Sequence, residues 1–199
     1  MNNRALALDA LRGYAIITMV LSATIVTHVL PGWMSHAQTP PPDHVFNPLL
    51  PGITWVDLVF PFFLFAMGAA FPFSIKKRAE KGDSKLKLVY EAGMVAAIML
   101  ATTSYADGKT FSLFSSNIII LLLANMAIFG SILYIFTMNN RWIRLGILIL
   151  LMAMILGSTV DGSWTQSVFN YTPLPWMYRF DYLKYLFIVI PGSIAGEYL

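Results

Sequence analysis

Long runs of apolar residues alternate along the chain with short polar or proline-rich stretches. The apolar runs cover residues 11–30, 55–75, 88–106, 117–137, 143–160 and 182–199. About 20 apolar residues suffice to cross a ~30 Å hydrocarbon layer as a helix, and a helix satisfies its own backbone hydrogen bonds there. The pattern therefore predicts an all-α fold, a polytopic transmembrane helix bundle with about six spans.

The composition supports this interpretation. Of the 199 residues, 57% are hydrophobic and only 12% are charged, whereas about 25% of the residues of a soluble domain are charged. So few charges cannot cover a water-facing surface, which argues against a soluble globular enzyme and against a disordered chain. The chain has no cysteine, so disulfides, thiol nucleophiles and cysteine-based metal sites are excluded. We expect a single transmembrane domain over residues 1–199, incomplete at the C-terminus because the last apolar run ends with the chain.

Lysine and arginine are distributed unevenly between the two sides of the expected bundle. Ten of the 13 lie on one side of the bundle: two in residues 4–12, six in residues 76–87 and two in residues 141–144. The other three lie on the opposite side. The positive-inside rule places the first group in the cytoplasm, together with the N-terminus, and residues 31–54 outside. We interpret the net charge of +3 mostly as this topological signal, and we expect the lipid bilayer as a partner and no nucleic acid.

Two groups of charged residues lie on the expected cytoplasmic side. Asp9 and Arg12 are three residues apart and share a helix face, so they form either an interfacial ion pair or a site in which Arg12 binds phosphate. The cluster of Lys76, Lys77 and Arg78 follows the second run. It either records topology and attracts anionic lipid, or contacts the phosphates of a nucleotide or of CoA.

On the expected outer side, an acid begins the second run and two histidines lie in the loop before it. Thr54 and Asp57 have the spacing of a capping box, so Asp57 either caps the helix or orients and charges a nearby histidine. His36 and His44 are the loop histidines, and histidine is suited to proton transfer near neutral pH. The sequence has no zinc signature such as HExxH, and we expect no metal.

Two segments resemble a known family of enzymes. Residues 8–13, Leu-Asp-Ala-Leu-Arg-Gly, resemble the Leu-Asp-x-x-Arg-Gly start of the membrane acetyltransferases typified by heparan-α-glucosaminide N-acetyltransferase. Residues 52–68 read Gly-Ile-Thr-Trp-Val-Asp-Leu-Val-Phe-Pro-Phe-Phe-Leu-Phe-Ala-Met-Gly. They are similar to that family's Gly-Leu-Thr-x-x-Asp-Leu-Val-Phe-Pro-Phe-Phe-Leu-Phe-x-x-Gly. The segments occur in the family's order, and the resemblance covers roughly residues 4–75.

The resemblance implies an acetyl-CoA-dependent acyltransferase of the bacterial inner membrane. Such enzymes move an acetyl group from cytoplasmic acetyl-CoA to an amino sugar or glycan on the far side, and a loop histidine is their key catalytic residue. Asp57 matches the motif's acid. We prefer His44 as the histidine because it lies eight residues before Gly52, whereas His36, which begins a His-Ala pair as in the family, needs a larger insertion.

At the inner mouth of the bundle, CoA phosphates are then expected to meet a mainly cationic set: Arg12, Asp9, Lys76, Lys77 and Arg78. A second class of function stays open, namely a non-enzymatic transporter or membrane assembly subunit that uses Asp57 and a loop histidine as ion or proton ligands. The acceptor of the acetyl group and homo-oligomerisation also stay open.

Overall fold

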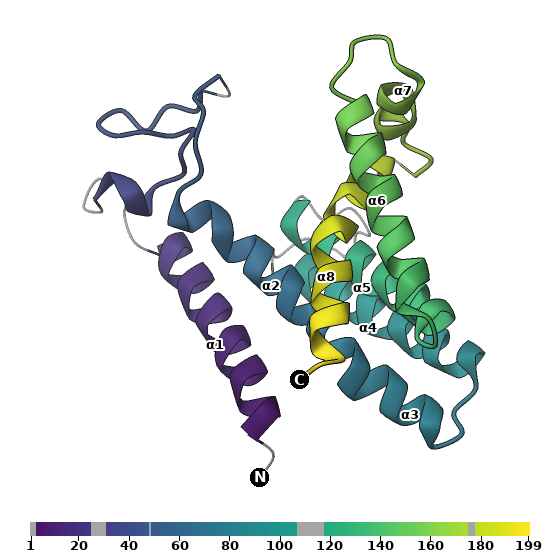
Figure 1. Ribbon diagram of the computed structural model, residues 1–199. Helices are drawn as coiled ribbons and strands as arrows, with labels where there is room; N and C mark the ends of the chain where they lie inside the picture. The colour runs from purple at the N-terminus through teal and green to yellow at the C-terminus, as the bar shows by residue number, and fades with distance from the viewer. Residues whose placement is uncertain (1–2, 25–30, 48, 107–117, 175–177) are drawn as a thin grey trace. The chain divides into compact units, whose positions relative to one another are not determined.

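The computed structural model describes residues 3–24, 31–47, 49–106, 118–174 and 178–199. These residues form helices joined by loops, and within the described ranges the only β-type pairing is an isolated bridge between Leu174 and Tyr178 (Figure 1). The predicted all-α class is confirmed. The chain divides into two compact units, residues 1–66 with Leu199 and residues 67–198.

The first unit contains α1 (Asn3–Thr24), a loop with the short helix η2 (Gly32–Met34) and the start of α2 (Trp55–Phe71). Helix α1 begins at Asn3, earlier than the predicted start at residue 11. An aromatic contact ties it to α2: the Trp55 indole Nε1 donates to the Tyr14 hydroxyl at 2.6 Å, and the Tyr14 ring lies edge-on to Phe62. This contact fixes the first turn of α2, which carries Asp57, against α1.

The helical stretch that begins with α2 continues past its predicted end at residue 75. It passes through a π-helical turn, η3 (Pro72–Lys76), into α3 (Lys77–Glu80), so that the helical stretch Trp55–Glu80 has 26 residues. Pro72 has no N–H to donate to the carbonyl four residues earlier, and a widened turn absorbs the missing bond. Gly82, with φ +97°, then reverses the chain, a conformation that glycine adopts without strain.

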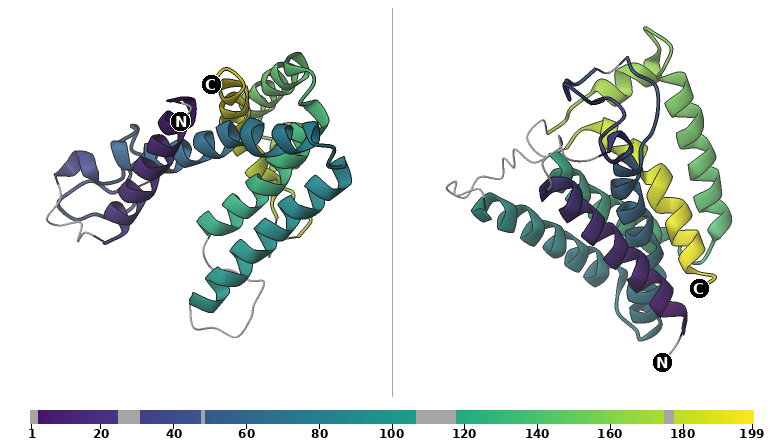
Figure 2. Two further views of the ribbon diagram at one scale, coloured as in Figure 1. Left: turned by 90° about the horizontal axis from the view of Figure 1, so that it is seen from below. Right: turned by 90° about the vertical axis from the view of Figure 1, so that its left-hand side faces the viewer.

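The second unit is built from α4 (Lys85–Ala106), α5 (Ile118–Thr137), α6 (Arg141–Gly157), α7 (Trp164–Asn170), η4 (Phe180–Tyr185) and α8 (Leu186–Gly196). Helices α4 and α5 lie side by side (Figures 1 and 2), while α8 packs against both α5 and α6. The Asn140 side chain caps α6 by accepting from the backbone N–H of Trp142 at 3.0 Å. Much of α5, including Asn125, is buried.

Helix α8 crosses the end of α2 at very short range. A Cβ atom at Gly68 would overlap the carbonyl group of Val189, and one at Gly196 would overlap the carbonyl group of Ala69. Glycine at these two positions therefore lets the two backbones touch. Gly130 of α5 joins the same contact, since a Cβ there would lie 3.0 Å from the Val189 side chain.

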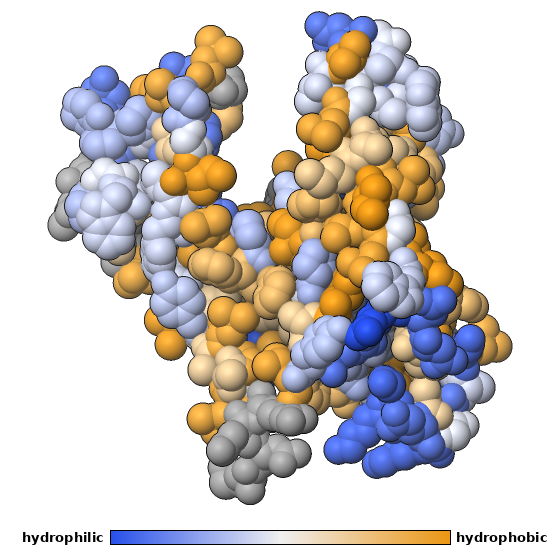
Figure 3. All heavy atoms as spheres, viewed as in Figure 1, coloured by the Kyte–Doolittle hydropathy of each residue, from blue (hydrophilic) through white to orange (hydrophobic). Residues whose placement is uncertain are grey.

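Within the described residues, two helical stretches are long and apolar enough to cross a membrane, Trp55–Glu80 and Ile118–Thr137. Six spans are not confirmed. Helix α6 has 17 residues and α8 has 11, so at about 1.5 Å per residue neither reaches ~30 Å by itself. Helix α6 nevertheless exposes apolar side chains, with Ile149 70% exposed, and Figure 3 shows them along this helix while hydrophilic residues gather around α3.

Candidate functional site

In the first unit, the loop before α2 places His36 against Asp57. The His36 Nδ1 lies 2.6 Å from Asp57 Oδ1, and the His36 side chain is 59% exposed whereas that of Asp57 is 20% exposed. A carboxylate only accepts hydrogen bonds, so the neutral imidazole that faces it carries its proton on Nδ1 and leaves Nε2 as an acceptor. This is the tautomer in which a histidine can take a proton from another molecule.

The second carboxylate oxygen of Asp57 is held by backbone donors from both sides. Asp57 Oδ2 accepts from the N–H of Thr54 at 2.9 Å and from the N–H of Ala37 at 3.2 Å. The Thr54 hydroxyl lies 3.0 Å from the same oxygen and 2.7 Å from the Ser35 carbonyl, and its single proton serves one of them at a time. Asp57 thus caps α2, as the spacing from Thr54 predicts, and also faces a histidine.

The loop folds back on itself to bring residues 36–37 to the start of α2. The Asn47 N–H donates to the Gln38 carbonyl at 2.7 Å, and the Thr39 N–H donates to the His36 carbonyl at 2.9 Å. Gly52 has φ +134° and approaches Ala37, since a Cβ at Gly52 would lie 3.6 Å from the Ala37 methyl. A residue with a side chain would be strained at this φ. The loop therefore needs glycine at position 52 to fold back on itself.

His44, the histidine preferred from the sequence, lies elsewhere in the loop. Its Nδ1 is 3.2 Å from the Thr39 carbonyl, and its own N–H donates to the Pro40 carbonyl. The structure brings His36 rather than His44 to Asp57, because the Ala37 N–H binds the same carboxylate and anchors the residue before it. The His-Ala pair was the signal in the sequence that favoured His36.

The charged residues expected at the inner mouth are placed in different surroundings. Asp9 and Arg12 of α1 form an exposed ion pair with a separation of 3.7 Å, which agrees with the simpler interpretation of this pair. In the second unit, Lys77 is exposed and Lys76 lines a cavity.

Arg78 is engaged by two carboxylates that connect α3 to α4. It donates to Asp83 at 2.9 Å and binds both carboxylate oxygens of Glu91. Lys87 also donates to Asp83, at 2.7 Å, and this hydrogen bond and the one from Arg78 lower the pKa of the Asp83 carboxyl. Arg78 therefore fastens the turn between two helices, and its phosphate-binding capacity is already occupied.

A buried charged pair in the second unit was not identified from the sequence, where Arg144 counted only as a cytoplasmic cation. Arg144 of α6 is completely buried, and its Nη2 lies 2.5 Å from Glu197 Oε1. The Tyr134 hydroxyl donates to the same oxygen at 3.2 Å, and the Arg144 guanidinium lies 4.9 Å from the Tyr134 ring centre. Within the described ranges, the buried Arg144 Nε has no hydrogen-bond partner. The pairing joins residues 53 positions apart, a distance at which the sequence pattern carries no signal.

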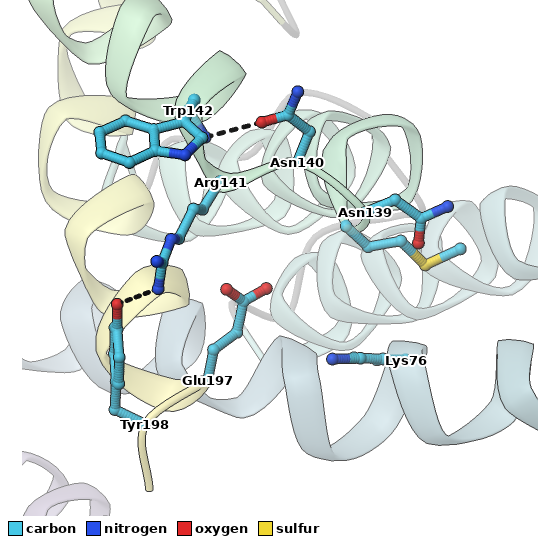
Figure 4. A pocket seen from close by; sticks show the side chains of 8 residues that line it. Lys76, Asn139, Asn140, Arg141, Trp142, Glu197 and Tyr198 are labelled. Carbon is cyan, nitrogen blue, oxygen red and sulfur yellow. Dashed lines mark hydrogen bonds between the residues drawn. The ribbon is translucent and has the colours of Figure 1, made fainter.

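Beside this pair lies a cavity of about 360 Å³ (Figure 4). Its lining is mostly polar and comprises Lys76, Met138, Asn139, Asn140, Arg141, Trp142, Glu197 and Tyr198. A second cavity, of about 420 Å³, is apolar and is lined by Ser167, Val168, Tyr171 and Phe180. Across the described residues, no three histidine or acidic side chains gather as ligands for a metal ion.

One family model matches the chain, and it covers both units. It is described as "Domain of unknown function (DUF5009)" and matches residues 4–92 and 81–199. No curated protein and no solved structure matches the chain.

Proposed function

The chain belongs to the DUF5009 family, and for this member we propose a membrane acyltransferase that moves an acetyl group from acetyl-CoA to a sugar amine or hydroxyl. The observation that carries the proposal is the contact of 2.6 Å between His36 and Asp57, at the start of the segment that resembles the membrane acetyltransferases. An exposed imidazole whose Nδ1 is held by a carboxylate is the arrangement that general base catalysis needs.

The chemistry assigns one role to each residue of the pair. His36 Nε2 takes the proton from the acceptor as its nitrogen or oxygen attacks the thioester carbonyl, the C–S bond breaks, and the sulfur leaves as CoA thiol after protonation. Asp57 accepts the Nδ1–H bond throughout and stabilises the imidazolium. Alternatively, Nε2 itself attacks the thioester and carries the acetyl group until the acceptor displaces it. In both schemes Asp57 holds the ring in the reactive tautomer.

The proposed setting is a bacterial inner membrane, with the N-terminus in the cytoplasm and the loop of His36 outside. It includes six spans, of which Trp55–Glu80 and Ile118–Thr137 have the required length and hydropathy. The remaining runs would then cross as shorter or interrupted helices, supported by neighbouring helices. The acyl donor would bind from the cytoplasm through its phosphates, for which Arg12 and Lys76 are the candidate contacts.

A transporter or assembly subunit is the second candidate, and the buried pair of Arg144 and Glu197 favours it. Charged residues buried among apolar helices are typical of ion and proton pathways. A transporter would not consume acetyl-CoA, whereas an acyltransferase would release CoA in step with acetylation of the acceptor.

The purified chain in liposomes, with acetyl-CoA and glucosamine supplied on both sides, tests the proposal. We expect free CoA and acetylated glucosamine to accumulate together, and Asp57→Asn to lower the rate by about 10²-fold or more, as expected for disturbing a general base. Asp43→Asn, a change to an exposed acid in the same loop, is the matched control and should keep the wild-type rate. Absence of CoA release with glucosamine and other amino sugars would favour the transporter or subunit.

A further inference from the structure

In the second unit, the cavity beside the pair of Arg144 and Glu197 is lined by cationic side chains. It is formed by Lys76 from η3, by the turn before α6, by the first residues of α6 and by Glu197 and Tyr198 at the end of α8. Figure 4 shows the side chains of Lys76, Arg141 and Glu197 directed toward the same space. The charge balance of these three groups decides which ligands the cavity can accept.

The negative charge of Glu197 is already compensated. Arg144, which is completely buried, lies 2.5 Å from its carboxylate, and the Tyr134 hydroxyl donates to it as well. An anion in the cavity therefore meets a Glu197 carboxylate whose negative charge is already balanced by Arg144.

The two remaining cations, Arg141 and Lys76, are not neutralised, and Arg141 is also held in place. Arg141 donates to the Tyr198 hydroxyl, and its guanidinium lies 5.7 Å from the ring centres of both Trp142 and Tyr198. These contacts orient the planar group but leave its charge unopposed. In the described part of the chain, no carboxylate forms an ion pair with Lys76. The cavity consequently presents one arginine and one lysine with net positive charge.

The backbone adds to the positive electrostatic potential of the cavity. The cavity lies at the N-terminus of α6, a helix of 17 residues, whose aligned peptide dipoles favour an anion even though the Asn140 side chain already accepts from the Trp142 N–H. Asn139 and Asn140 contribute side-chain amides to the lining. Arginine binds two oxygens of a phosphate through its planar fork, while lysine acts as a point charge. These donors suit a tetrahedral anion with several oxygens.

We propose that this cavity binds a phosphate monoester. Its volume of about 360 Å³ accommodates a phosphate and a small organic group. The organic group is either that of a soluble phosphate ester or the glycerol of a phospholipid headgroup, and the chemistry of recognition is the same. The proposal rests on the cavity and its charges and requires no acetyl transfer, although it shares Lys76 with the proposed contact to the CoA phosphates.

Two probes that share one headgroup distinguish the sources. The soluble probe is sn-glycerol 3-phosphate, and the lipid probe is dioleoylphosphatidic acid in dodecyl maltoside micelles, with dioleoylphosphatidylcholine at the same mole fraction as the reference. Thermal unfolding of the purified full chain is followed as each probe is titrated at constant ionic strength. A ligand that binds only the folded state raises the unfolding midpoint.

Two double variants distinguish binding of the probe in this cavity from general attraction of anions to exposed cations. Lys76→Gln with Arg141→Gln removes both cations of the lining, while Lys77→Gln with Lys81→Gln removes two exposed cations that do not line it. Loss of one charge-assisted contact weakens binding by about tenfold. We therefore expect the half-saturating concentration to rise about 100-fold in the first double variant and less than about twofold in the second.

Stabilisation by glycerol 3-phosphate identifies a soluble ester as the ligand, and stabilisation by phosphatidic acid alone identifies a lipid headgroup. The inference is overturned if neither probe raises the unfolding midpoint of the wild-type chain, or if both double variants lose binding equally. Should the first double variant fail to fold, Lys76→Gln alone, a change at an exposed position, must still weaken binding about tenfold.

Discussion

Replacing Gly68 by alanine should push α8 away from the end of α2, because the added methyl group has no space. The new Cβ would lie 3.0 Å from the carbonyl carbon of Val189 and 3.1 Å from the amide nitrogen of Ser193, and it would overlap the Val189 carbonyl oxygen. All three are backbone atoms, so no rotation of a side chain relieves the clash. The two helices must separate or bend.

The size of the effect follows from these distances. Ordinary van der Waals contact of a Cβ begins near 3.4 Å, so the backbones must part by at least about 0.4 Å to clear the carbon alone, and by more to clear the oxygen. Overpacking a well-packed core costs about 1–3 kcal/mol, and a rigid backbone contact favours the upper end. Alanine returns up to about 1 kcal/mol through its better helix propensity. The net loss is then about 2 kcal/mol, or about 4–8 °C for a chain of this size.

Thermal unfolding of the purified chain in detergent measures this loss, and Gly146→Ala in α6 is the matched control. A Cβ at Gly146 has no atom within 4 Å, so this variant gains helix propensity without a clash and should unfold at or above the wild-type temperature. The packing described for α2 and α8 is refuted if Gly68→Ala proves as stable as Gly146→Ala.

Three further predictions concern topology, the buried charges and pH. A single cysteine at Leu49, which is 88% exposed, should react with an impermeant thiol reagent in intact cells, and one at Ser84 should not; the reverse pattern would invert the proposed orientation. Arg144→Met should destabilise the chain by up to about 3–5 kcal/mol because it leaves the partly buried Glu197 carboxylate without its cation, and adding Glu197→Gln should restore part of that loss in thermal unfolding; no restoration would contradict the pairing. The lowered pKa of Asp83 means that its ion pairs stabilise the fold above about pH 4 and that this contribution is lost as the pH falls through the folded-state pKa. Unfolding temperatures from pH 6 to pH 3 should therefore fall further for the wild-type chain than for Asp83→Asn, and equal falls would contradict the prediction.

Elements with local causes could be predicted from the sequence. The apolar run 117–137 corresponds to α5, Ile118–Thr137, because a long run of apolar side chains leaves helix as the way to pair its backbone. The cap at Asp57 also has a local cause, the spacing from Thr54. The end of this helical stretch could not be predicted, because the apolar run stops at residue 75, where the cationic residues begin, whereas the helix continues through the π-helical turn to Glu80.

The arrangement of the candidate site depends on contacts between distant residues, which periodicity does not reveal. The choice of His36 over His44 follows from the fold-back of the loop at Gly52 and from the N–H of Ala37 on Asp57. Composition leaves this choice open, because both histidines lie in the same loop.

In the proposed acetyl transfer, His36 is the proton acceptor or acetyl carrier and Asp57 holds it. The most direct measurement compares His36→Ala with His44→Ala in the full chain at matched expression, by following transfer of labelled acetyl from acetyl-CoA to glucosamine. Removing a general base lowers the rate by about 10²–10⁴-fold, so we predict that loss for His36→Ala and a rate near the wild-type value for His44→Ala. A rate in His36→Ala equal to that of the wild-type chain, with loss only in His44→Ala, would contradict the claim.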